Sequence, residues 1–572
     1  MKILRLLAAL AVAAASLSPM PRASAQPQSV NTPRPNILLI ALDDVGFSDL
    51  GAFGSEIKTP HMDSIARAGL RFNHFGSKSI CSSTRASLLT ARNPHTVGMS
   101  DLASRKPVKD PADTGPSRGE IPANAQFLSQ VLRKAGYSTF AVGKWHLSPD
   151  YETGEPDKRA SWPLQRGFDK FYGFLSGWTD QYRPNLVEDN TKIATPVAPG
   201  YHFAQDITDR AIANLKARDA SKPFFLYYAA SIAHEPMQVP KPYIDAYNGL
   251  YDQGWDKLRA ARFERMKQIG VIPADTKLPP INPGDPAWDT LSPEQKKVYA
   301  RFMQTYAGFL THGDEQIGRV LAYLRETGLD RNTLVVLISD NGAASEGIGN
   351  GGFRRPYFDT TPLSEMAAHL DELGSPTTVA LYQRPWAMTG SAPFQRYKLY
   401  PYLGGVRTPM MISWPGTIKD TGAVRSQHVD TIDIAPTIAE AVGLTFDDAV
   451  DGVKQIPVAG RSFLPALRSA NAPSPRNVQY FELRGNRAIA LDNWRAVAMH
   501  KRGTSFDTDD WKLFDLSKDF SESENLAARY PDQLAKMKAA WQQEAQKYGV
   551  LPLTEMSPLM QSRSFMKSEF AD

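Results

Sequence analysis

The sequence is poor in cysteine and has no marked excess of charge. Cys81 is the one cysteine among 572 residues. A single cysteine excludes an intrachain disulfide framework, because each bridge needs two. The 65 basic and 60 acidic residues leave a formal net charge of only +5. No block of basic residues interrupts this balance, so we do not expect a nucleic acid as a partner.

Long apolar runs are also missing, apart from a short one near the N-terminus. Residues 6–15 are apolar, follow Lys2 and Arg5, and precede the small residues Ala23-Ser24-Ala25. This order predicts a signal peptide over residues 1–25 that is cleaved after Ala25. The alternative, a membrane anchor, is disfavoured because the run is too short to span a bilayer. We therefore expect a periplasmic or secreted protein with no membrane span and, once processed, a formal charge of +2.

Two apolar runs each end in oxygen-bearing side chains. Residues 36–42 and 333–339 are continuous apolar segments, typical of buried parallel strands. Polar residues at the carboxyl ends of such strands belong to the functional edge of an α/β sheet. Adjacent acids on a loop are usually just solvated, but two such strand ends together favour a site for a hard divalent cation. The predicted ligands are Asp43, Asp44, Asp340 and Asn341.

Cys81 lies in a stretch where a strand pattern gives way to a helix pattern. Residues 70–75 alternate as a strand does, and residues 86–92 have a helical pattern. The unpaired N–H groups at a helix start attract anions, and Arg85 is one helical turn from Cys81. A lone cysteine is most often a small buried apolar side chain, so Cys81 by itself favours a structural role.

Further candidates follow other predicted strands. Residues 137–143 lead to Lys144 and His146, and residues 223–230 lead to His234. Since side chains of a strand repeat every two residues, Lys144 and His146 should point the same way. The plainer interpretation is a surface lysine and a structural histidine.

The stretch around Cys81 resembles the sulfatase signature, Cys-x-Pro/Ala-Ser/Thr-Arg, three variable residues, then Leu-Thr-Gly-Arg. Ser83 replaces the usual proline or alanine, and Ala91 the usual glycine. A Lys–x5–Gly-Gly pattern begins at Lys398, with Leu403 in place of the usual glutamate. The residues that match the signature are Cys81, Thr84, Arg85, Leu89, Thr90 and Arg92.

The resemblance implies an arylsulfatase that hydrolyses small-molecule sulfate esters. It implies that a maturation enzyme converts Cys81 to formylglycine, and that one calcium ion is bound by the four oxygen ligands and by residue 81. It also implies roles for the other candidates. Arg85 favours the ionised nucleophile, Lys144 and Lys398 neutralise sulfate oxygens, His234 donates a proton to the leaving alcohol, and His146 is the base that regenerates the aldehyde.

The implied fold is α/β, an alkaline-phosphatase-like sandwich with a large mixed, mostly parallel sheet and a smaller C-terminal α+β domain with an antiparallel sheet. We expect a catalytic domain over residues 26–475, with covering insertions near 237–292 and 343–395, and a C-terminal subdomain over 476–572. Two other functions stay open. The first is phosphate or phosphonate ester hydrolysis on the same scaffold, and the second is binding of sulfated compounds without catalysis if Cys81 is unmodified.

Overall fold

The structure, a computed structural model, describes residues 34–103, 115–152, 154–196, 198–355 and 359–555. The predicted signal peptide lies outside these residues. The described residues from Pro35 onward pack as one unit. Within the described ranges, no helix has both the length and the apolar character needed to cross a membrane.

Ten strands form the central sheet in the order β11-β2-β10-β9-β1-β8-β4-β5-β6-β7. The middle strands, from β9 to β5, pair in parallel, whereas β10, β6 and β7 pair antiparallel to their neighbours. This arrangement confirms the predicted large, mixed and mostly parallel sheet. The strands are β1 (Asn36–Leu42), β2 (Leu70–Phe72), β4 (Ser138–Lys144), β5 (Lys170–Phe174), β6 (Val187–Glu188), β7 (Thr191–Lys192), β8 (Phe224–Ala229), β9 (Thr333–Ser339), β10 (Met410–Ser413) and β11 (Ala423–Arg425).

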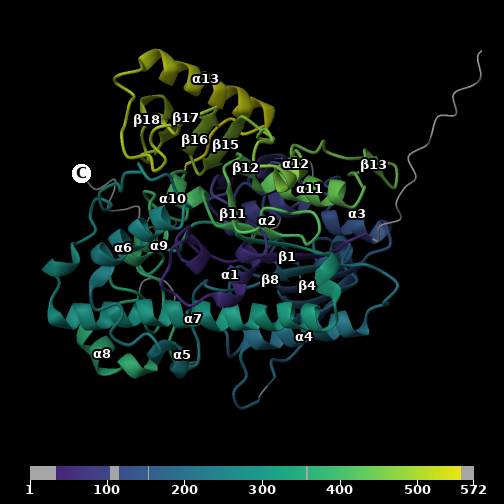
Figure 1. The fold of residues 1–572 in the computed structure, drawn as a ribbon, viewed down its shortest axis with the longest axis horizontal. Coiled ribbons are helices and arrows are strands. Elements are labelled where there is room, and N and C mark those ends of the chain that lie inside the picture. Colours follow the sequence, from purple (N-terminus) through teal and green to yellow (C-terminus); the bar gives the residue numbers. More distant parts are fainter. Residues whose placement is uncertain (1–33, 104–114, 153, 197, 356–358, 556–572) are drawn as a thin grey trace, which may run out of the picture. The chain divides into compact units, whose positions relative to one another are not determined.

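Helices cover both faces of this sheet. Alternate residues of β1 enter two separate cores, because strand side chains point to opposite faces: Leu38 and Ile40 join one, Ile37 and Leu39 the other. Figure 1 shows α4 and α7 on one side of the sheet and α2, α3 and α11 on the other. These helices are α2 (Cys81–Thr90), α3 (Leu128–Lys134), α4 (Phe203–Ala217), α7 (Pro293–Glu326) and α11 (Ile434–Ala441).

Helix α7 runs unbroken through Gly313. A Cβ atom added at Gly313 would lie 2.3 Å from Cδ1 of Ile232. The glycine is therefore required by the close approach of Ile232, which follows β8, and not by a bend of the helix.

The two predicted insertions contain helices, and two of these, α6 and α9, contact the loop after β1. Arg262 of α6 donates to Asp49 Oδ1 at 2.7 Å, and Ser48 N donates to the carbonyl of Gly390, the last residue of α9, at 2.8 Å. Since Asp49 is completely buried, this contact fixes the chain a few residues beyond the predicted metal ligands. The helices are α5 (Lys241–Asp245), α6 (Gly254–Gln268), α8 (Leu363–Ala368) and α9 (Arg384–Gly390).

The C-terminal region forms a four-stranded antiparallel sheet packed against one helix. This confirms the predicted α+β composition with an antiparallel sheet. The boundary at residue 476 stays a prediction. The elements are β15 (Val478–Leu483), β16 (Asn486–Leu491), β17 (Trp494–Ala498), β18 (Trp511–Asp515) and α13 (Pro531–Lys547).

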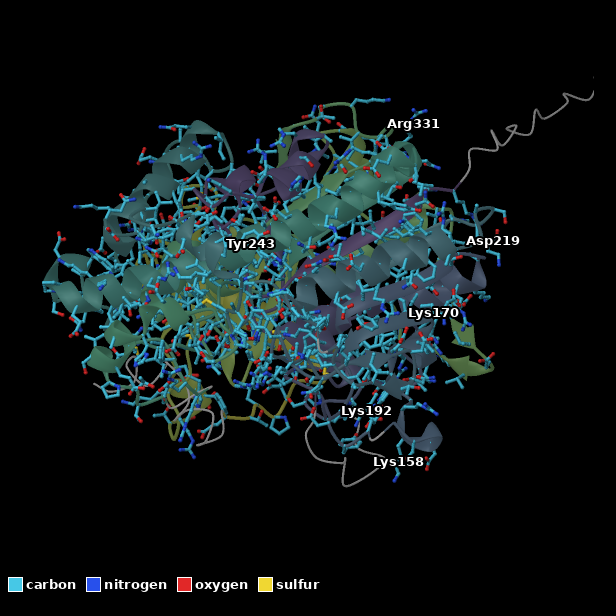
Figure 2. The ribbon with its side chains drawn as sticks, turned by 90° about the horizontal axis from the view of Figure 1, so that it is seen from below. Lys158, Lys170, Lys192, Asp219, Tyr243 and Arg331 are labelled. Atoms are coloured by element: carbon cyan, nitrogen blue, oxygen red, sulfur yellow. The ribbon has the colours of Figure 1, made fainter. Side chains whose placement is uncertain are left out.

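Charged side chains lie along the β5–β7 edge of the central sheet. Figure 2 shows Lys170 and Lys192 projecting there, and both are exposed. Lys170 Nζ lies 2.8 Å from Oδ2 of Asp189, a residue of the turn between β6 and β7. Charges of this kind protect an edge strand from pairing with another chain.

Candidate active site

The two predicted oxygen-rich strand ends lie side by side. Strands β1 and β9 are parallel neighbours with Leu42 opposite Ser339, so Asp43 and Asp340 leave the sheet at the same edge. The Asp44 amide donates to Asp340 Oδ1 at 3.3 Å. All four predicted ligands, Asp43, Asp44, Asp340 and Asn341, have no exposed surface, which rules out a solvated pair of loop acids.

Cys81 is the first residue of α2 and is 1% exposed. Its Sγ atom lies within 4.8 Å of a carboxylate oxygen of Asp43, one of Asp44 and a ring nitrogen of His234. Burial raises the pKa of the Cys81 thiol well above its usual range, and the ammonium groups of Lys144 and Lys398 offset this only in part. The unmodified thiol is therefore protonated at neutral pH and is a weak nucleophile.

Three buried cations each face one acid of this cluster. Lys144 Nζ lies 2.7 Å from Asp43 Oδ2, and Lys398 Nζ lies 2.8 Å from Asp44 Oδ2. Arg85, which the sequence placed facing Cys81, donates through Nε and Nη2 to Asp340 Oδ2 at 3.0 and 2.8 Å. Its Nη1 donates to the Lys144 carbonyl at 3.0 Å. Arg85 therefore holds the acids and the end of β4 together.

The two adjacent acids respond differently to this environment. Burial by itself would raise the pKa of Asp43, but the Lys144 ammonium holds it well below the usual range. For Asp44, burial together with the neighbouring Asp43 raises the pKa to about 7, although Lys398 opposes the shift. The negative charge of Asp44 is thus poorly compensated by the protein alone.

The donor set of the cluster fits a hard divalent cation. Asn341 Nδ2 donates to Asp44 Oδ1 at 2.5 Å, while Asn341 Oδ1 is buried and has no hydrogen-bond partner among the described residues. A buried amide oxygen without a partner is costly, and a cation would satisfy it. Carboxylate and amide oxygens are the ligands that calcium prefers.

The two predicted histidines differ in how they reach the cluster. His234 Nε2 lies 3.6 Å from Asp44 Oδ2, and its Nδ1 lies 2.7 Å from the carbonyl of Glu235. A carbonyl only accepts, so Nδ1 carries a proton. Burial and Lys144 lower the pKa of His234 to about 3.

His146 is buried beside Cys81, but the argument from strand alternation does not hold for it. Strand β4 ends at Lys144, and His146 has a left-handed backbone with φ of 55°. The hydroxyl of Ser82 donates to the His146 carbonyl at 2.8 Å, which ties this residue to the start of α2.

Two acidic residues of the site were not predicted. Glu346 Oε1 lies 2.9 Å from Lys398 Nζ, and Glu235 contributes an oxygen to a group with Asp44 and Glu346 in which these atoms lie within 4.8 Å of one another. Glu235 follows His234 directly in the chain, which was a signal that could have identified it. Glu346 lies in a covering insertion, where nothing in the sequence indicated its position.

Glycines allow the Lys398 loop to approach the end of β9. A Cβ atom at Gly342 would lie 1.9 Å from the Gly404 carbonyl, and one at Gly404 would lie 2.1 Å from the Arg396 carbonyl. The Lys398 amide donates to the Ala343 carbonyl at 3.1 Å. These close backbone contacts explain the need for the Gly-Gly pair after Lys398.

The two departures from the signature also have a structural description. Ala91 caps α2 with φ of 58°, a conformation that glycine adopts without strain. Ser83 is buried, and its hydroxyl has no partner among the described residues. Leu403 stands where the pattern has a glutamate, and its amide donates to Glu522 Oε2 at 2.8 Å.

Comparison with known proteins identifies the family. The Sulfatase family model matches residues 35–444, and the model "N-sulphoglucosamine sulphohydrolase, C-terminal" matches residues 396–547. An uncharacterized sulfatase of Schizosaccharomyces pombe is 32% identical over 89% of this chain and 93% of its own length. An arylsulfatase of Klebsiella aerogenes is 29% identical over 79% of this chain and 95% of its own.

The fold is also shared with solved structures. The crystal structure of Ps i-CgsB in complex with k-i-k-neocarrahexaose matches with a TM-score of 0.62 and 21% identity, over 94% of this chain and 100% of that one. The family match over most of the chain and the similarity to two sulfatases agree with the buried cluster around Cys81. The chain belongs to the sulfatase family, whose activity is the hydrolysis of sulfate esters.

Proposed function

We propose that this protein hydrolyses small aryl sulfate esters with a formylglycine made from Cys81 and a calcium ion held by the four oxygen ligands. The observation that carries the proposal is the buried cluster in which three cations face three acids around the start of α2. When present, the hydrated aldehyde supplies an oxygen nucleophile and calcium supplies positive charge for sulfate oxygens.

The two lysines are suited to neutralise the sulfate group. An ammonium has three N–H donors. Lys144 directs its contacts to the two oxygens of Asp43, and Lys398 to Asp44 and Glu346, so each retains one N–H for a sulfate oxygen. Sulfate transfer, like phosphoryl transfer, depends mainly on such charge stabilisation.

The histidines are suited to move protons. His234 would protonate the leaving oxygen from Nε2, which requires the doubly protonated ring because Nδ1 is committed to the Glu235 carbonyl. The negative charge of a bound sulfate ester favours that form. His146 would remove the hydroxyl proton that regenerates the aldehyde.

Arg85 acts indirectly in this proposal, through residues that it positions. Its shortest contacts are with Asp340 and the Lys144 carbonyl, so it would orient a calcium ligand and the end of β4. Its positive charge still favours an ionised nucleophile nearby, as the signature implies.

Co-expression with a formylglycine-generating enzyme tests the proposal. Mass spectrometry of the peptide that contains residue 81 should show the aldehyde, and hydrazide labelling should detect it. Activity on 4-nitrophenyl sulfate should rise with the labelled fraction, and Cys81→Ala should lose both. A fully active, unlabelled protein would reject the nucleophile. Faster cleavage of 4-nitrophenyl phosphate or of a phosphonate ester would favour the alternative activity instead.

Export by a signal peptide over residues 1–25 is part of the same proposal. It agrees with the predicted periplasmic or secreted location. N-terminal sequencing of protein from the periplasmic fraction should begin at Gln26, and a start at Met1 would contradict it.

A further inference from the structure

The side chain of Glu235 is buried at the active site without any partner. It is 4% exposed, and neither carboxylate oxygen has a hydrogen-bond partner among the described residues. One of these oxygens lies within 4.8 Å of an oxygen of Asp44 and one of Glu346. A buried carboxylate without a partner is unfavourable unless a ligand or a proton compensates it.

Among the described residues, Glu235 has no cation of its own in the cluster. Each of the three carboxylates of the proposed calcium site contacts one of the three cations already described. Glu235 and Glu346 add two further acidic groups, and the one cation near them, Lys398, is shared between Asp44 and Glu346. A bound calcium ion would balance the two remaining negative charges overall. Its proposed ligands do not include Glu235, so the Glu235 carboxylate would still lack a direct partner.

A second metal ion does not fit this acidic group. Lys398 Nζ is 2.8 Å from Asp44 Oδ2 and 2.9 Å from Glu346 Oε1, and so occupies the position between them. Glu235 follows His234, the proposed donor to the leaving oxygen, and both reach within 4.8 Å of Asp44. The carboxylate without a partner therefore belongs to the residue next to the proposed proton donor.

We infer that Glu235, backed by Glu346, is a specificity site that binds a positively charged ammonium group on the alcohol portion of the substrate. The inference rests on the proposed sulfate ester hydrolysis and narrows its substrate class to sulfate esters of amine-bearing alcohols or phenols. A charge-assisted hydrogen bond from an ammonium to Glu235 would supply the missing partner.

Three sulfate esters of matched size test this inference. They are the aminomethyl, ethyl and hydroxymethyl derivatives of phenyl sulfate, each as the meta and para isomer. Wild type should show a kcat/KM at least about tenfold higher for the aminomethyl ester than for the ethyl ester, the size expected of a charged hydrogen bond. Glu235→Gln should bring this ratio close to one, and Glu440→Gln, at an exposed position of α11, should keep it.

The ratio is measured within each variant, so partial loss of folded protein affects both esters equally. A second measurement needs no variant. Benzylammonium should inhibit hydrolysis of 4-nitrophenyl sulfate by wild type with an inhibition constant at least about tenfold lower than that of benzyl alcohol. Equal rates for the aminomethyl and ethyl esters, an unchanged ratio in Glu235→Gln, or an equal preference for the neutral hydroxymethyl ester would each overturn the inference. Failure to cleave any of the three esters would reject the proposed hydrolysis itself.

Discussion

The guanidinium of Arg85 lies 2.8 Å from Asp340 Oδ2, and both side chains are completely buried. This pair joins the signature helix to the end of β9, because Arg85 belongs to α2 and Asp340 follows the strand directly. This buried ion pair thus helps to hold Cys81 beside the proposed metal ligands.

Replacing Arg85 should therefore reduce stability as well as activity. Arg85→Ala leaves Asp340 buried without its partner, and we expect a loss of about 3–5 kcal/mol in the free energy of unfolding. Arg85→Lys keeps the charge but loses the fork that donates through Nε and Nη2, so its loss should be smaller. Urea unfolding measures both. Arg133→Lys, in an exposed pair with Asp169, is the control and should change stability by less than about 1 kcal/mol. A fully stable Arg85→Ala would contradict the structural role.

Removal of the metal should destabilise the folded protein. We expect one calcium ion per chain, and treatment with a chelator should lower the melting temperature, because a ligand that binds only the folded state at 100 times its Kd stabilises it by about 2.7 kcal/mol. Calcium should restore stability better than magnesium, which requires stricter geometry. Asn341→Ala should weaken the response, whereas the exposed Asn471→Ala should not. Two zinc ions in a metal analysis would instead indicate the phosphatase branch of the scaffold.

The unusual Ser83 provides a test of the signature itself. Its hydroxyl is buried without a partner, so Ser83→Ala, which restores a residue common in the family, should stabilise the protein by about 1 kcal/mol. The neighbouring Ser82→Ala should have the opposite effect, because it removes the hydrogen bond to the His146 carbonyl. Urea unfolding of the two variants gives the comparison. A Ser83→Ala protein less stable than wild type would indicate a contact that the structure lacks.

The sequence predicted the part of the site that depends on strand ends. Asp43 and Asp340 follow apolar runs, and adjacent parallel strands bring such residues to one edge of a sheet. The structure confirms the sheet and places these acids together. Their roles in binding metal stay predictions.

The rest of the site could not be predicted from local patterns. Glu346 reaches Lys398 only through the path of a covering insertion, and a local pattern does not determine that path. The direction of Arg85 depends on the acid across the sheet edge, which one turn of helix does not specify. His146 leaves the strand in a left-handed conformation, so the two-residue repeat of a strand did not apply to it.

The leaving group of the substrate separates His234 from the other site residues. A proton donor matters most when the departing alkoxide is basic, since a nitrophenolate leaves without much assistance. If His234 is the general acid, His234→Ala should slow alkyl and weakly acidic phenyl sulfates far more than 4-nitrophenyl sulfate, and such assistance is typically worth about 10²–10⁴-fold. Arg85→Lys is the matched control, because Arg85 contacts Asp340 and the end of β4, so its losses should be similar for all leaving groups.

The measurement is a plot of the logarithm of kcat/KM against the pKa of the leaving alcohol or phenol, for wild type, His234→Ala and Arg85→Lys. The slope should become steeper only in His234→Ala, provided that cleavage of the ester limits the rate. Parallel lines for wild type and His234→Ala would reject His234 as the donor. They would leave Lys398, whose ammonium lies 2.8 Å from the same Asp44 oxygen that His234 approaches to 3.6 Å, as the next candidate to test.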